Sequence, residues 1–205
     1  MPFEIPEREI SLYHGTVIAH SSPAPSEGLH RTDFGQGYYV TSIPFQAEEW
    51  AKSIAYQRMP DGKESFYVYE YAFRRPGKGA EEIKIRLFPE YDKRWLDFIV
   101  SNRLAGPDAQ DLPRDDLIIG GMADRLKDKP DGSRRMTLPG LLEKYQRGET
   151  DAQTVLSIIR PRKAMDQYCF RTEAAARLLR RVRGWQWTRE KIFGEWRWIR
   201  RDAHV

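Results

Sequence analysis

The apolar residues of this 205-residue chain recur with two periods, and the order of those periods predicts the fold. Residues 10–14, 38–42, 66–73, 83–88 and 165–171 are rich in aromatic and β-branched residues or alternate with polar ones, as strands do. Residues 117–122 form an apolar run typical of a buried strand. Helices are predicted over residues 44–58, 89–104, 138–147, 151–159 and 173–182. Because strands and helices do not alternate regularly, we expect an α+β fold.

Composition narrows the class of protein. The length suits one domain, and no apolar run is long enough to span a bilayer, so we expect a cytoplasmic protein. The single cysteine, Cys169, excludes an internal disulfide and suits a buried apolar position. The net charge of +4 resides in the tail, because residues 174–205 carry nine basic and three acidic side chains.

The tail predicts a structure of its own. Residues 184–188 and 195–199 alternate as two strands with four tryptophans on one face. Basic residues interleaved with aromatic ones are typical of a nucleic-acid surface, and a hairpin packed on the domain or a tail buried by a partner protein is the alternative. We therefore expect a domain over residues 1–183 and a basic hairpin or tail over residues 184–205.

Residues 34–41, Phe-Gly-Gln-Gly-Tyr-Tyr-Val-Thr, are the segment with the clearest chemistry. Two glycines permit a tight turn, and the following strand presents aromatic rings beside backbone amides. This combination suits a flat heteroaromatic ligand that carries an amide. The segment lacks the length and the Lys-Ser/Thr of a phosphate loop, which argues against binding of a nucleoside triphosphate.

Together with residues 12–16, Leu-Tyr-His-Gly-Thr, this segment resembles the first two signature strands of ADP-ribosyltransferases of the diphtheria-toxin and poly(ADP-ribose)-polymerase types. Those enzymes carry a His-Tyr-Glu triad, and a second aromatic residue follows the tyrosine by eleven positions, as Trp50 follows Tyr39 here. Residues 166–170, Asp-Gln-Tyr-Cys-Phe, match the third strand with Gln167 in place of the glutamate. The same strings resemble an uncharacterised bacterial toxin-like family over roughly residues 10–180.

The resemblance implies a role for each matched residue. His14 would bond the ribose 2′-hydroxyl of NAD, and Tyr39 and Trp50 would stack on the two faces of its nicotinamide. Gln167 would accept a ribose hydroxyl but has no negative charge with which to stabilise an oxocarbenium ion. By alternation, Asp166 faces away from Gln167. The catalytic residues implied are His14, Tyr39 and Gln167, and the NAD-binding residues implied are His14, Gly15, Thr16, Arg31, Gly37, Tyr39 and Trp50.

Arg31 and Asp33 precede the glycine segment, where a basic side chain would reach the NAD diphosphate, although a surface salt bridge is the alternative. The implied fold is a split α+β fold of two small antiparallel sheets with flanking helices. The implied function is NAD-dependent ADP-ribose transfer to a protein or nucleic acid, by a toxin with an antitoxin partner and without metal or membrane. A silent NAD- or ADP-ribose-binding module and a nucleic-acid-binding interaction protein are the alternatives.

Overall fold

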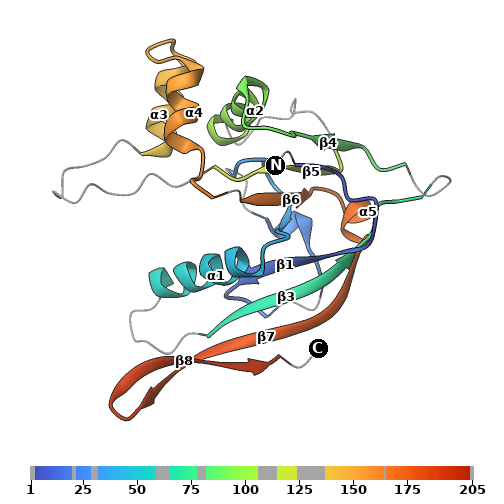
Figure 1. Ribbon diagram of the computed structural model, residues 1–205, viewed down its shortest axis with the longest axis vertical. Helices are drawn as coiled ribbons and strands as arrows, with labels where there is room; N and C mark the ends of the chain where they lie inside the picture. Colours follow the sequence, from blue (N-terminus) through green and yellow to red (C-terminus); the bar gives the residue numbers. More distant parts are fainter. Residues whose placement is uncertain are drawn as a thin grey trace.

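Two four-stranded sheets form the framework of the protein (Figure 1). The computed structural model describes residues 3–19, 22–28, 32–58, 65–77, 82–105, 115–123, 137–163 and 165–203. Sheet A contains, in spatial order, β1 (Ile10–Thr16), β3 (Ser65–Phe73), β7 (Leu179–Ile192) and β8 (Glu195–Asp202). Sheet B contains β2 (Tyr38–Val40), β6 (Asp166–Phe170), β5 (Leu117–Gly121) and β4 (Ile85–Leu87). All neighbouring strands are antiparallel except β4 and β5, so the fold is α+β as predicted.

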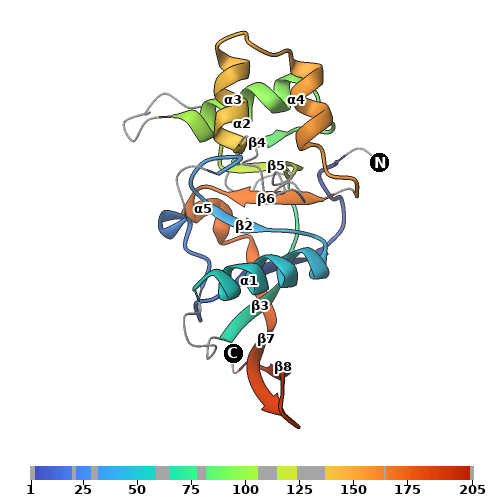
Figure 2. The ribbon, with the colours of Figure 1, turned by 90° about the vertical axis from the view of Figure 1, so that its left-hand side faces the viewer.

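Helices cover the two sheets on their outer faces (Figure 2). Helix α1 (Pro44–Arg58) lies on sheet A, where its small side chains Ala47, Ala51 and Ala55 allow a close approach to the strands. The outer face of sheet B packs against three helices, α2 (Lys93–Leu104), α3 (Leu138–Gln146) and α4 (Ala152–Ile159). Two short helical segments, α5 (Glu173–Ala176) and η1 (Pro25–Glu27), lie in the connections.

Strand alternation divides the apolar residues among three cores. On β6, Tyr168 and Phe170 enter the core between the sheets, whereas Cys169 enters the core under α2, α3 and α4. On β3, Phe66 contributes to the core under α1 and Tyr71 to the core between the sheets. Successive side chains of one strand therefore serve different layers, which fixes the strand register because a one-residue slip would exchange the layers.

Most predicted elements are confirmed with small shifts of their ends. Helix α1 spans the predicted residues 44–58, and β3, α3, α4 and β6 differ by one or two terminal residues. The predicted helix over residues 173–182 is wrong, because only α5 is helical and β7 begins at Leu179. Thr172 caps α5, with its hydroxyl accepting from the amide of Ala175. Pairing of Leu179 with Phe73 on β3 outweighs the helical preference of this alanine-rich segment.

The two sheets meet where their edge strands touch. β1 is the edge of sheet A and β2 the edge of sheet B. They share one bridge, in which the amide of Tyr13 donates to the carbonyl of Thr41 at 2.7 Å and the amide of Thr41 donates back at 2.9 Å. We call this junction of β1 and β2 the seam.

The tail is a hairpin that belongs to sheet A. β7 pairs with β3 from Leu179 to Thr188 and with β8 from Trp185 to Ile192, so the expected boundary between residues 183 and 184 falls inside one strand. A bulge at Val182 interrupts the pairing, since Glu70 opposes Arg183 and Tyr71 opposes Arg181. The bulge sends Arg183 to the α1 side, next to Glu70 and Trp185, and Arg181 to the other side, over Tyr69.

Candidate functional site

The seam brings together segments of the chain that are far apart in sequence. His14 lies on β1, Tyr39 on β2, and Gln167 on β6 beside β2. The register pairs Tyr39 with Cys169, so Gln167 lies two residues farther along the neighbouring strand and on the same face of sheet B. The three residues of the predicted triad thus occupy three adjoining strands, but Tyr39 and Gln167 face the helix-covered side of sheet B, whereas the ring of His14 stacks on Tyr38 on the side between the sheets.

His14 joins the two sheets through its side chain. Its Nδ1 lies 2.6 Å from the carbonyl oxygen of Tyr39, and its ring stacks on that of Tyr38 with centroids 4.2 Å apart. A carbonyl oxygen only accepts, so Nδ1 carries the proton and Nε2 is the acceptor nitrogen of the neutral ring. The imidazole is thus held in one tautomer and one orientation.

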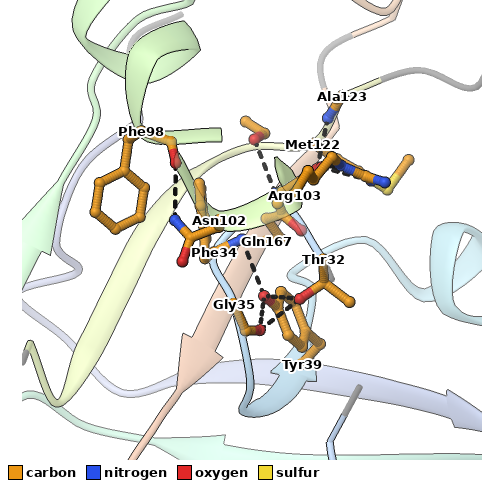
Figure 3. Close-up of polar contacts among 12 residues, drawn as sticks. Thr32, Phe34, Gly35, Tyr39, Phe98, Asn102, Arg103, Met122, Ala123 and Gln167 are labelled. Carbon is orange, nitrogen blue, oxygen red and sulfur yellow. Dashed lines mark hydrogen bonds and ion pairs between the residues drawn. The ribbon is translucent and has the colours of Figure 1, made fainter. Parts of the chain in front are cut away.

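Tyr39 is fixed by the loop that precedes its strand (Figure 3). Its hydroxyl lies 2.7 Å from both the carbonyl oxygen of Gly35 and the hydroxyl of Thr32, and it accepts from the amide of Phe34 at 3.0 Å. Gly35 has a φ of 78°, which a glycine adopts without strain. Burial raises the pKa of the Tyr39 phenol well above its ordinary value. Tyr39 therefore stays protonated at neutral pH.

Gln167 belongs to a buried polar network centred on Asp33. Its Nε2 donates to Oδ2 of Asp33 at 3.0 Å and to the carbonyl oxygen of Gly121 at 3.1 Å. Asp33 also accepts from the amide of Ala123 at 2.9 Å and from Arg103, whose Nε and Nη2 both lie 2.6 Å from Oδ1. Asp33 is 3% exposed and Gln167 7%. Four donors and the guanidinium charge stabilise this buried carboxylate, which in turn holds the Gln167 amide in place.

This network corrects the expectation for Asp33, and Arg31 lies outside the described residues. Asp33 forms a buried ion pair with Arg103 rather than a surface salt bridge. The sequence offered little signal for that pair, because the two residues are 70 positions apart and lie on different elements. One clue was available, since an aspartate directly before an apolar residue in a glycine-rich segment suits a carboxylate that holds a loop.

Two of the predicted glycines lie where only hydrogen fits. A Cβ on Gly15 would stand 1.9 Å from the carbonyl oxygen of Ala47, so β1 and α1 touch at this point. A Cβ on Gly37 would stand 2.5 Å from Sγ of Cys169. Thr16 serves the turn after β1, where its hydroxyl accepts from the amide of Ile18 at 3.1 Å.

Trp50 lies on α1, one turn beyond Gln46, and is 41% exposed. Gln46 donates through Nε2 to the carbonyl oxygen of Asp166 at 2.7 Å, so this stripe of α1 faces the start of β6. The carboxylate of Asp166 accepts from the amide of Ser42 at 2.9 Å, away from Gln167 as alternation predicted. That Tyr39 and Trp50 clamp one ring stays a prediction.

The protein is thus an α+β protein of two joined sheets. Around the seam lie the hydrogen-bonded side chains of His14 and Tyr39 and the buried network of Gln167. Residues 10–180 match DUF3990, a protein family of unknown function, and the chain belongs to that family. The comparisons with the curated proteins and with the solved structures found no match.

Two further findings concern the described part of the chain. None of its helices combines the length and the apolar character that crossing a membrane requires. No three histidine, cysteine or carboxylate side chains among the described residues gather as ligands of a metal ion would.

Proposed function

We propose that the protein is an NAD-dependent ADP-ribosyltransferase whose substrate binds along the seam. One observation carries the proposal: three short motifs spread over more than 150 residues lie on three adjoining strands, β1, β2 and β6. The His-Gly, Gly-x-Gly-Tyr-Tyr and Gln-Tyr-Cys-Phe strings suggest this function, and a coincidental match would not require the strands that carry them to adjoin.

The roles follow from the chemistry of each group. Nε2 of His14 would accept the hydroxyl of the nicotinamide ribose, while the backbone of Gly15 would pair with the carboxamide. The rings of Tyr39 and Trp50 would enclose the nicotinamide, which is a cation in NAD and gains about 1–2 kcal/mol from each desolvated aromatic face. As the glycosidic bond breaks, nicotinamide leaves with the bonding electrons and the ribose C1 carbon becomes electron-poor. The acceptor then supplies the new bond to that carbon and loses a proton.

Gln167 limits how much this chain itself contributes to that step. A neutral amide fixes a ribose hydroxyl but neither removes a proton nor offsets developing positive charge. The network gives weight to a second candidate function, a module that binds NAD or ADP-ribose without cleaving it. The donor side of the Gln167 amide is already bonded to Asp33 and Gly121, so its position is fixed for recognition rather than for proton transfer.

The wider setting is part of the same proposal. We infer a cytoplasmic toxin that is held inactive by an antitoxin protein and that modifies a protein or nucleic acid. The motive is the similarity of the Gly-Gln-Gly-Tyr-Tyr and Gln-Tyr-Cys-Phe strings to a bacterial toxin-like family. The reaction described uses NAD as a substrate and requires no metal ion.

Binding and chemistry are measured separately on the intact protein. NAD at a hundred times its Kd adds about 2.7 kcal/mol to the free energy of unfolding, which raises the Tm of a chain of this size by roughly 5–10 °C. NAD labelled in the nicotinamide reports cleavage, and NAD labelled in the adenylate reports transfer to macromolecules of a lysate.

His14→Asn keeps a donor for the Tyr39 carbonyl but lacks Nε2, so it should lose the NAD-dependent Tm shift. Tyr13→Phe is the matched control, because the Tyr13 side chain, next to His14 in the sequence, packs on the α1 side of sheet A. A Tm shift with nicotinamide release supports the enzyme, and a shift without release supports the binding module. The absence of any shift in the wild-type protein refutes both functions.

A further inference from the structure

The two faces of the β7–β8 hairpin differ in how their basic side chains are paired. On one face, Arg197 pairs with Glu195 at 2.9 Å and Arg201 with Glu190 at 2.6 Å. The opposite face, here the tryptophan face, lies on the α1 side of sheet A. The register and strand alternation place on it Trp185, Trp187, Arg189, Lys191, Trp196, Trp198, Arg200 and Asp202.

On the tryptophan face the arginines lie over rings instead of carboxylates. The guanidinium of Arg189 is 5.3 Å from the ring centroid of Trp196, and that of Arg200 is 5.5 Å from the ring centroid of Trp185. Within the described residues, no carboxylate forms an ion pair with Arg189, Arg200 or Lys191. These three cations therefore have no carboxylate partner within the described residues, and Asp202 is the one acidic side chain that shares their face of the hairpin.

The aromatic residues of this face divide into supports and exposed rings. Trp187 is buried and stacks on Phe66 with centroids 5.0 Å apart, and Trp198 donates its indole N–H to the hydroxyl of Tyr56 at 2.9 Å. Trp196 and Tyr56 are each 49% exposed. The inner tryptophans hold the hairpin against β3 and α1, whereas the outer rings remain open to a ligand.

We infer that the tryptophan face binds single-stranded nucleic acid. Cations without a carboxylate partner attract phosphates, and exposed rings stack on unpaired bases, whose flat faces are inaccessible within a duplex. Lys191 and Trp185 stand six residues apart on β7, which corresponds to roughly 20 Å of strand at 3.4 Å per residue. The face is therefore long enough to follow several nucleotides. This inference does not depend on NAD binding, so either proposal fails or survives without the other.

The test measures anisotropy of fluorescein-labelled 12-nucleotide oligothymidylate and oligouridylate with the full chain over a salt series. Arg189→Gln combined with Arg200→Gln removes two cations from the tryptophan face. Arg197→Gln combined with Arg201→Gln removes the same charge from the opposite face and is the matched control. Each lost phosphate contact lowers the slope of log K against log salt by about 0.7, so the first pair should lower it by roughly 1.4 and the control should not change it.

The stacking contribution is tested by a second pair of variants. Trp196→Ala should weaken binding roughly 5- to 150-fold, the range for loss of one stacked base. Phe193→Ala at the fully exposed hairpin turn removes an aromatic ring outside the tryptophan face and should leave binding unchanged. Because Trp196 is half-exposed, its replacement should leave the Tm within about 2 °C of wild type.

Several results would overturn the inference. They are absence of oligonucleotide binding, equal weakening by both arginine pairs, equal affinity for polyglutamate, and a dimer in solution that buries Trp196. Polyglutamate carries charge without bases, so equal affinity would mean that stacking contributes nothing. A difference between the two oligonucleotides supports the inference and identifies the preferred sugar, and equal affinity for them supports recognition of bases and phosphates alone.

Discussion

The Gln167→Glu substitution tests the buried network most directly. It restores the residue of the ADP-ribosyltransferase triad while changing only an amide to a carboxyl group. In the present structure that amide donates to Asp33 at 3.0 Å and to the Gly121 carbonyl at 3.1 Å. The introduced group would face one carboxylate and one carbonyl oxygen with no hydrogen of its own unless it becomes protonated.

The cost follows from the pKa of the introduced carboxyl. A glutamate titrates near 4.3 in the unfolded chain, so keeping it protonated at pH 7 costs about 1.36 kcal/mol for each of the roughly 2.7 pH units between, or about 4 kcal/mol. A protonated carboxyl also has one hydrogen where the amide has two, which removes one hydrogen bond worth about 1 kcal/mol. We expect a loss of about 3–5 kcal/mol in the free energy of unfolding at pH 7.

The pH dependence gives the sign of the effect. Burial beside Asp33 raises the pKa of the introduced carboxyl in the folded state above its unfolded value. The folded variant then binds more protons than the unfolded variant, so its stability falls as pH rises from about 4.3 to the folded pKa. Between pH 7 and pH 5 the protonation cost falls by about 2.7 kcal/mol, and most of the deficit should disappear.

Urea unfolding of the wild type and the variant at pH 5 and pH 7 measures this change. Gln186→Glu is the control, because the Gln186 amide is half-buried and donates to the neutral hydroxyl of Ser65 at 3.1 Å. Combining Gln167→Glu with Asp33→Asn leaves one carboxylate, and its loss should be smaller than the sum of the single losses. A deficit at pH 7 below 1 kcal/mol, or one that does not change with pH, would refute the Asp33–Gln167 arrangement.

Three further predictions concern other parts of the fold. Gly15→Ala should destabilise the protein by about 1–3 kcal/mol or more in thermal unfolding, because its methyl would meet the Ala47 carbonyl, and an unchanged Tm would disprove that contact. Burial alone raises the pKa of Glu70, but hydrogen bonds from Ser11 and Arg183 outweigh it and lower the pKa. Arg183→Gln should cost about 1 kcal/mol in the free energy of unfolding at pH 7, and urea unfolding should show this difference vanish as the pH falls through the lowered pKa of Glu70. Burial raises the pKa of Cys169 to about 12, so iodoacetamide at pH 8 should label it over ~100-fold more slowly in the folded than in the urea-unfolded protein, as followed by mass spectrometry.

The sequence predicted most elements because their signals are local. Helix α1 begins at Pro44, which suits a first helical turn, and β3 consists almost wholly of aromatic and β-branched residues. The segment after Thr172 misled the prediction because alanine and arginine favour a helix. Its conformation is decided by long-range pairing with β3, which local preference does not contain.

The sequence pointed to the residues of the candidate site but not to the hydrogen bonds between them. Period-two alternation gave the relative facing of Asp166 and Gln167, and the motif strings identified His14 and Tyr39. The bond from His14 to the Tyr39 carbonyl and the partnership of Gln167 with Asp33 depend on which strands become neighbours. That choice is made by the packing of all three cores together, so no single segment encodes it.

The bulge at Val182 decides which side chains of β7 face α1. In a regular strand that paired Val182 with Glu70, Arg181 and Arg183, which are two apart, would project from the same side of the sheet. Val182 is instead left unpaired, so Arg183 opposes Glu70 and every residue beyond it is shifted by one position against β3. The regular pairing would turn the indoles of Trp185 and Trp187 away from α1 and direct Gly184 and Gln186 toward it. The aromatic and cationic character of the hairpin is thus set by a single insertion upstream of it.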